Sequence, residues 1–236
     1  MNPNAANPGR DRVGHELRAD GVKDPTANPF RSGIHSRGYL PHVKREGAEY
    51  FVTFRLADSL PRAVLRRYEA EAAARLRTLR EAPGGGAAQI DDAESIHRDF
   101  RRQVERYLDQ GAGECHLRRP EVAELLTEAL QFFHERRYVL REWVVMPNHV
   151  HVLFWPMPNH LVGEIVKSWK QFTSLRAKRV LGLGEGRFWQ PEAYDHWVRD
   201  DRDRARIARY VRNNPVTAGL CAAPEDWPWS SASRVK

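Results

Sequence analysis

The sequence predicts an α+β sandwich of the ferredoxin-like type, a mostly antiparallel sheet with helices on one face. β-rich runs alternate with helical stripes in the order β, α, β, β, α, β, α. Two of these runs flank a Pro-Asn turn at 147–148, which is typical of a hairpin. The run 149–154 alternates between apolar and polar faces. Its apolar face should meet the helices, and the last helix should lie near the opposite face.

The composition indicates a soluble enzyme or binding protein with a polyanionic partner. The chain has 236 residues, 41% of them hydrophobic, which is enough for one domain with extensions. Lys and Arg outnumber Asp and Glu by 38 to 31, and the pI is near 9.7. Two cysteines, Cys115 and Cys221, exclude a disulfide framework or a cysteine-rich zinc site. With no apolar run of transmembrane length and no signal peptide, we expect a cytoplasmic protein without membrane contact.

The chain divides into a tail and one domain. Residues 1–33 are rich in Asn, Pro and Gly and predict a disordered tail, and residues 34–236 predict the domain. The first strand should be 50–56, followed by a helix that starts at 58–61 and ends near Arg80. A helical insertion around 83–118 should interrupt this first crossover.

Periodicity and capping residues predict the remaining elements. The expected last helix is capped by Asp200 or Asp201 and ends near Asn213, because Pro215 should stop it. Before it we expect helices at 92–110, from Pro120 onward and at 161–181, and strands at 138–146, 149–154 and 194–198.

One face of the helix at 161–181 carries lysines without acidic partners. Lys167, Lys170 and Lys178 share this face with Ser174. A solvated outer face would look the same, but such a stripe is also what a phosphate backbone selects. We therefore predict that these lysines bind DNA.

The hairpin places two imidazoles on one face of the sheet. His149 and His151 are two residues apart on the second strand, so both side chains point the same way. Two neighbouring imidazoles can hold one divalent metal ion. The alternative is a pair of polar residues on the wet face of a half-buried sheet.

The last helix carries a phenol and an amide one turn apart, at Tyr210 and Asn214. An isolated helical tyrosine is usually a core residue. If this helix packs on the sheet face that carries the imidazoles, however, the four side chains form a site for metal-assisted phosphodiester transesterification. Free tyrosine has a pKa of about 10 and is a poor nucleophile at neutral pH, so the metal must activate the phosphate. The resulting phosphotyrosine keeps the energy of the ester, which suits cutting and rejoining.

Together these motifs resemble the single-tyrosine HUH transposases, and most closely the REP-associated tyrosine transposases. The resemblance covers about residues 34–233. It depends on Met146-Pro-Asn-His-Val-His-Val152, Phe188-Trp-Gln190, Tyr210-Val-x-x-Asn-Pro-Val216 with Gly219-Leu220, and Trp227-Pro-Trp-Ser-Ser231.

The resemblance implies a mechanism and a partner. The pair His149/His151 would bind Mg²⁺ or Mn²⁺ with Asn214 as third ligand. Tyr210 would attack single-stranded DNA, hairpin-forming or repeat-derived, and form a 5′-phosphotyrosine with a free 3′-hydroxyl. The long crossover and the 1–33 tail depart from the family pattern. The tyrosine could serve its own subunit or that of a homodimer partner.

Alternatives remain at this point. Tyr194 is a rival nucleophile, His196 a rival ligand or supporting residue, and Asn213 a rival to Asn214, although it points about 100° away on the helix. The chain could also be a metal-dependent phosphodiester hydrolase that activates water. A third alternative is a non-catalytic relative that only grips structured DNA.

Overall fold

The computed structural model describes residues 33–36, 41–44, 47–82 and 87–234. Most of the predicted tail, residues 1–32, and the predicted break at 83–86 therefore lie outside the described residues. Within the described residues, no helix combines the length and the apolar character that crossing a membrane requires.

The core of the protein is a four-stranded antiparallel sheet in the order β4-β5-β3-β6, which confirms the predicted α+β class. Its strands are β3 (Tyr50–Arg55), β4 (Tyr138–Val145), β5 (His149–Pro156) and β6 (Tyr194–Trp197). Strands β1 (Gly33–Ser36) and β2 (Pro41–Lys44) form a separate antiparallel pair. The α-helices in the described residues are α1 (Arg62–Glu81), α2 (Ala87–Asp109), α3 (Pro120–Phe132), α4 (Val162–Leu181) and α5 (Asp201–Thr217), and the 3-10 turns there are His116–Arg118 and Pro224–Asp226.

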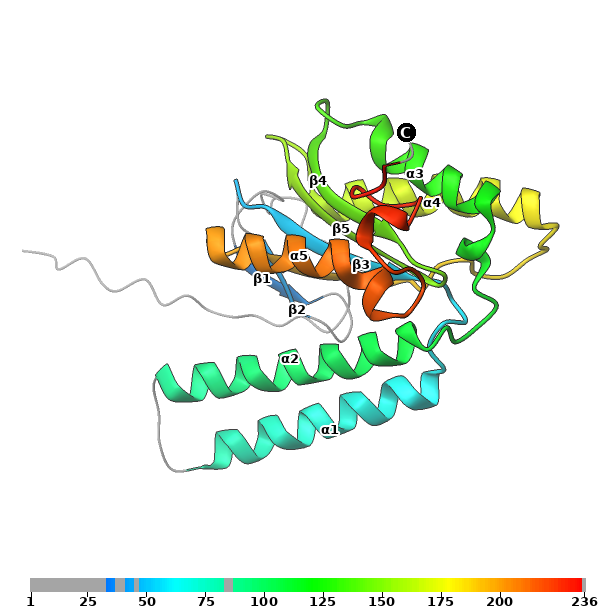
Figure 1. Ribbon diagram of the computed structural model, residues 1–236. Coiled ribbons are helices and arrows are strands. Elements are labelled where there is room, and N and C mark those ends of the chain that lie inside the picture. Colours follow the sequence, from blue (N-terminus) through cyan, green and yellow to red (C-terminus); the bar gives the residue numbers. More distant parts are fainter. Residues whose placement is uncertain (1–32, 37–40, 45–46, 83–86, 235–236) are drawn as a thin grey trace, which may run out of the picture.

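Alternation along the strands divides the interior into two layers. Val150, Val152 and Phe154 pack with residues of α3 and α4, as predicted. The other face is not open: Phe51 and Leu153 pack there against Ile207 and Val211 of α5. Figure 1 shows α5 crossing this face, with α3 and α4 on the far side of the sheet. The last helix is therefore a third layer that encloses the face carrying the imidazoles.

Helices α1 and α2 form a long antiparallel hairpin beside the sandwich (Figure 1). Helix α2 starts at Ala87, five residues before the predicted Asp92, and the predicted apolar stripe buries Ile96 and Leu108. Helix α1 has no buried residue. The hairpin is thus held to the domain mainly through α2.

Helix α5 begins where predicted and ends later than predicted. The Asp200 side chain accepts a 2.7 Å hydrogen bond from the Asp203 amide, which caps the N-terminus. The prediction that Pro215 stops the helix near Asn213 is wrong, because the helix continues to Thr217. A proline in the last turn removes only one backbone hydrogen bond, and its own carbonyl accepts from the Leu220 amide.

Candidate active site

The site begins with two imidazoles side by side on β5. His149 and His151 are both 0% exposed. Their partners across the strand pair are Arg55 and Thr53, which therefore point to the same face. Helix α5 packs on this face of the sheet and buries both imidazoles, so the alternative of two polar residues on a wet face is wrong.

Asn148 fixes the tautomer of His149. Its Nδ2 donates to the carbonyls of Leu108 and Ala112 at 3.0 and 2.9 Å, so its Oδ1 must be the atom that lies 2.7 Å from His149 Nδ1. An amide oxygen only accepts, and His149 therefore carries its proton on Nδ1. The lone pair of His149 is left on Nε2, which faces His151.

His151 is held by two contacts. Its Nδ1 lies 2.7 Å from Thr53 Oγ1, and its ring stacks on Phe51 with centroids 5.4 Å apart. Burial and, to a smaller extent, the nearby Arg55 guanidinium lower the pKa of His149 to about 3, and burial also lowers the pKa of His151. Both rings are therefore neutral at physiological pH, the form that binds a metal.

Tyr210 and Asn214 meet the imidazoles from α5. The Tyr210 hydroxyl lies 3.2 Å from His151 Nε2 of the same chain. Asn214, one turn later, is 2% exposed, and its Oδ1 has no hydrogen-bond partner among the described residues. The structure thus brings together all four residues that the sequence singled out on β5 and α5.

The donor set fits a divalent metal ion. The two Nε2 atoms are 3.0 Å apart, and two nitrogens each about 2.1 Å from one ion at a right angle are separated by about 3 Å. No group of three His, Cys, Asp or Glu side chains suitable for a metal occurs in the described part of the chain. The buried Oδ1 of Asn214, which has no hydrogen-bond partner among the described residues, is an oxygen donor that could serve as a third ligand. Mixed imidazole and amide-oxygen ligation suits Mn²⁺ or Mg²⁺.

Two carboxylates on α2 complete the surroundings of Tyr210, and sequence reasoning missed both. Glu105 and Tyr210 act on each other's pKa across the cleft that both line, and burial raises the pKa of Glu105 to about 7. Burial also raises the pKa of Asp109 to about 6. Burial, then the charges of Glu105 and Asp109, raise the pKa of Tyr210 above its ordinary value, so the phenol is protonated at neutral pH. In the sequence, the only sign of these two carboxylates was their position near the buried Leu108 of α2.

Arg55 was missed as well. It lies next to His149 across the strand pair, and its Nη1 is buried without a hydrogen-bond partner among the described residues. Burial lowers its pKa to about 10, so it remains charged. A fixed positive charge beside the imidazoles is suited to an anionic substrate.

The rival residues are engaged in other contacts, although Tyr194 is paired with Thr53 and lies on the same face of the sheet as the imidazoles. Tyr194 makes an edge contact with Phe51 and lies under the Arg101 guanidinium. His196 Nε2 lies 3.0 Å from an oxygen of Asp203, so that nitrogen is already paired. Asn213 donates to the Arg209 carbonyl at 2.9 Å.

The lysine stripe of α4 is partly used inside the protein. Lys170 donates to the carbonyls of Gln190 and Pro191 at 2.5 and 2.9 Å, and burial lowers its pKa to about 8. Lys178 donates to the Gly186 carbonyl, and Lys167 is exposed. Two of the three lysines thus tie α4 to the following loop, and their DNA contacts stay a prediction.

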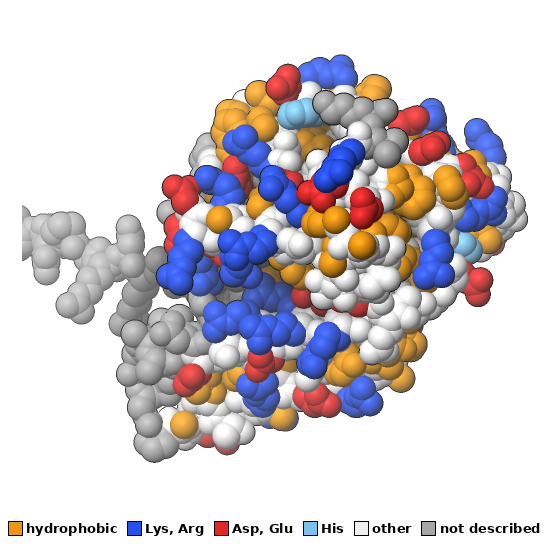
Figure 2. Space-filling model, viewed as in Figure 1, with side chains coloured by type: hydrophobic (Ala, Val, Ile, Leu, Met, Phe, Trp, Pro, Cys, Tyr) orange, Lys and Arg blue, Asp and Glu red, His pale blue; other side chains and the backbone are white. Residues whose placement is uncertain are grey.

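A cleft of about 540 Å³ leads to Tyr210. It runs between the α1–α2 hairpin and α5, and Tyr210 and Asn214 lie in its wall. Figure 2 shows Lys and Arg side chains gathered where α5 faces α2. The cleft is lined by Arg75, Asp99, Arg102, Gln103, Glu105, Arg106, Asp109, Tyr210, Asn214 and Thr217.

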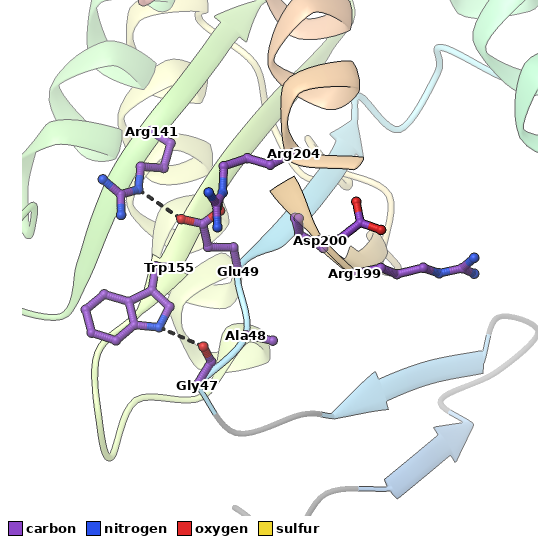
Figure 3. A pocket seen from close by; sticks show the side chains of 9 residues that line it. Gly47, Ala48, Glu49, Arg141, Trp155, Arg199, Asp200 and Arg204 are labelled. Atoms are coloured by element: carbon purple, nitrogen blue, oxygen red, sulfur yellow. Dashed lines mark hydrogen bonds and ion pairs between the residues drawn. The ribbon is translucent and has the colours of Figure 1, made fainter. Parts of the chain in front are cut away.

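A second hollow, of about 320 Å³, lies at the start of β3 (Figure 3). There the buried Glu49 carboxylate accepts from Arg141 of β4 at 3.0 Å and from Arg204 of α5 at 2.6 Å. Trp155 donates to the Gly47 carbonyl at its rim. These ion pairs join α5 to the sheet, so they help to hold Tyr210 over the imidazoles.

Comparison with known proteins gives the family context. Residues 116–214 match a family model described as "Transposase IS200 like". A REP-associated tyrosine transposase of Escherichia coli K12 is 27% identical over 100 residues, which cover 42% of this chain and 58% of that protein. A protein of Haemophilus influenzae named for the same group is 31% identical over 104 residues, covering 38% and 56%. The chain thus spans little more than half the length of these relatives, and the resemblance indicated by the motifs is confirmed.

Two solved structures are related more distantly. A REP-associated tyrosine transposase bound to a REP hairpin aligns with 84% of this chain and 81% of that one, at 16% identity and a TM-score of 0.45. A transposase from Deinococcus radiodurans R1 aligns with 76% and 96%, at 18% identity and a TM-score of 0.35. At such low similarity neither structure bears on the role of an individual residue.

Proposed function

We propose that this chain, whose residues 116–214 match the IS200-like transposase family, cuts and rejoins single-stranded, hairpin-forming DNA. Tyr210 is the nucleophile, and a 5′-phosphotyrosine is the covalent intermediate. His149, His151 and Asn214 are the ligands of Mg²⁺ or Mn²⁺. The curated relatives carry the name REP-associated tyrosine transposase, which makes repeat-derived DNA the first substrate to test.

The observation that carries this proposal is the 3.2 Å separation between the Tyr210 hydroxyl and His151 Nε2. A tyrosine that only packs in the core would not need its hydroxyl beside the histidine nitrogen that would bind the metal. Asn214, one turn after Tyr210, has a buried Oδ1 without a partner among the described residues, and the lone pair of His149 faces His151. A phosphate bound there would lie next to the nucleophile, which is the geometry that in-line attack requires.

Each residue has a separate task in the reaction. A bound divalent ion would withdraw charge from a non-bridging phosphate oxygen. Asn148 and Thr53 orient the two imidazoles, and α5 keeps water away from them. Arg55 offsets the charge of the phosphate from the β3 side. The Tyr210 oxygen forms a bond to phosphorus while the bond from phosphorus to the 3′-oxygen breaks, and a 3′-hydroxyl can later reverse the step.

The DNA path is proposed from charge. The cleft that ends at Tyr210 contains Arg75, Arg102 and Arg106, and the whole chain carries a net charge of +7. Of the three carboxyl groups in the cleft, Asp99 is paired with Arg75 at 3.0 Å, and burial raises the pKa of the other two, Glu105 and Asp109. Guanidinium groups contact phosphates in a sequence-independent way and position a strand. Tyr210 and the imidazoles meet within one chain, so a monomer is sufficient for the chemistry.

The direct test is adduct formation on labelled single-stranded oligonucleotides with hairpins, with and without Mn²⁺, followed by a denaturing gel. Wild type should give a metal-dependent protein–DNA band that Tyr210→Phe lacks while it still binds DNA. Cleavage that produces no protein-linked DNA and survives Tyr210→Phe would instead establish a hydrolase. Salt-sensitive binding without any cleavage would establish a non-catalytic binder.

A further inference from the structure

The tyrosine of the proposed reaction must lose a proton, and the imidazoles are poorly placed to take it. His149 is protonated on Nδ1 and directs its only lone pair toward the metal space. His151 Nε2 faces the same space, and its Nδ1 is engaged with Thr53. A nitrogen that donates its lone pair to a metal cannot also accept a proton. The phenol therefore needs another acceptor.

Glu105 is the group that reaches the phenol from the opposite side. It lies on α2, in the wall of the cleft that also contains Tyr210. Its carboxylate is close enough to the Tyr210 hydroxyl for each group to act on the pKa of the other. Figure 1 shows α2 between α1 and α5, so the hairpin brings this carboxylate to the tyrosine helix.

The surroundings of Glu105 suit a group that accepts and releases a proton. Burial raises its pKa to about 7, near the value at which a general base works best at neutral pH. The charged and titratable groups that act on it are Tyr210, Arg101, Asp109 and Arg206. Asp109 raises the pKa of Glu105, and the two arginines lower it. The neighbouring charges thus act on the pKa of the carboxylate in opposite directions.

We propose that Glu105 is the general base of the strand-cleavage step, a catalytic residue supplied by the α1–α2 hairpin outside the matched family segment. This proposal rests on the proposed function. The Tyr210 oxygen forms the bond to phosphorus and its proton passes to the Glu105 carboxylate. The 3′-oxygen leaves with the electron pair of the broken bond and takes a proton from water. Glu105 returns its proton to solvent, so the net change is one phenol proton exchanged for one 3′-hydroxyl proton.

The location of Glu105 explains why the site needs its long crossover. Residues 116–214 contain the imidazoles, Tyr210 and Asn214, whereas α2 ends at Asp109 and lies outside them. In the described structure, α2 encloses Tyr210 from the side that α5 and the sheet leave open, because the cleft walls come from α1, α2 and α5. The hairpin therefore supplies both a wall for the DNA strand and the acceptor for the proton.

The test compares Glu105→Gln with wild type in the rate of adduct formation on a fluorescent pool of single-stranded hairpin DNA with random flanks, in Mn²⁺. Loss of a general base should slow adduct formation by about 100-fold. The wild-type rate should rise between pH 5.5 and 8, and the Glu105→Gln rate should be flat across this range. The control is Glu124→Gln, the same change at an exposed position of α3, which should match wild type.

Two outcomes separate the two proposals. Wild type without any adduct would overturn the proposed function and this inference with it. If wild type forms adducts and Glu105→Gln forms them at a rate within about threefold of wild type and with the same pH profile, only the proposed role of Glu105 is overturned. If Glu105→Gln does not fold by circular dichroism, Glu105→Asp decides. It keeps the charge with a shorter reach, so a slower rate supports the role and an unchanged rate overturns it.

Discussion

Thr53 Oγ1 and His151 Nδ1 lie 2.7 Å apart on neighbouring strands, and this contact sets the direction in which the imidazole presents its other nitrogen. Thr53 is 8% exposed, so its hydroxyl is shielded from water. Groups that orient a metal-binding histidine in this way typically contribute to affinity although they never touch the ion.

Thr53→Val should therefore weaken Mn²⁺ binding while the fold stays intact. Valine keeps the shape and removes only the hydroxyl, and we expect a loss of about 10-fold to 100-fold in affinity, measured by calorimetric titration. Thr78→Val, the same change at an exposed position of α1, should bind Mn²⁺ like wild type. Equal affinities of the Thr53 and Thr78 variants would show that the hydroxyl does not orient the ring.

Asn148 links the hairpin turn to the end of α2, and its loss should destabilise the protein. It is 0% exposed and makes three side-chain hydrogen bonds, to the carbonyls of Leu108 and Ala112 and to His149. Asn148→Ala leaves these buried groups unpaired, at a cost of about 3 kcal/mol in the free energy of unfolding.

Urea denaturation measures this cost. Asn213→Ala, which loses a single side-chain hydrogen bond to the Arg209 carbonyl, is the matched control and should cost less than about 1 kcal/mol. An Asn148→Ala variant as stable as the control would mean that the three contacts are not maintained in solution.

Glu105 should make the protein less stable as the pH rises. Burial raises its pKa from 4.5 to about 7, so the folded state binds the proton more tightly than the unfolded state. This stabilising contribution is complete below pH 4.5 and is lost as the pH rises to about 7, a change of about 3 kcal/mol. Glu105→Gln removes this titrating group. The free energy of unfolding of the variant, measured relative to that of wild type, should therefore rise by this amount between pH 4.5 and 8.

Denaturation of both proteins at these two pH values gives the comparison. Glu124→Gln, the same change at an exposed position of α3, is the matched control. If the free energies of unfolding of Glu105→Gln and wild type change in parallel with pH, the Glu105 carboxyl does not titrate in a buried environment.

Sequence pattern predicted the parts of the site that depend on local spacing. The alternation along β5 placed both imidazoles on one face, and the four-residue step on α5 placed Tyr210 and Asn214 together. Their convergence followed from the class of fold, since a helix after the last strand must pack on one face of the sheet.

The sequence pattern could not predict the features of the site that depend on contacts between distant segments of the chain. Glu105 is one polar position among many on an amphipathic helix, and only the docking of α2 beside α5 sets it apart. Arg55 is likewise an ordinary strand residue until the register pairs it with His149. The extent of α5 was missed because a proline was expected to end the helix, although in a final turn it costs only one hydrogen bond.

The most direct measurement of the central claim is the identity of the residue that becomes attached to DNA. The protein is incubated with single-stranded hairpin DNA and Mn²⁺, the DNA is trimmed with nuclease, and the peptides are mapped by mass spectrometry. The account predicts a nucleotide phosphate on the tyrosine of the Tyr210 peptide. Attachment at Tyr194, or metal-dependent cleavage with no modified tyrosine, would contradict it.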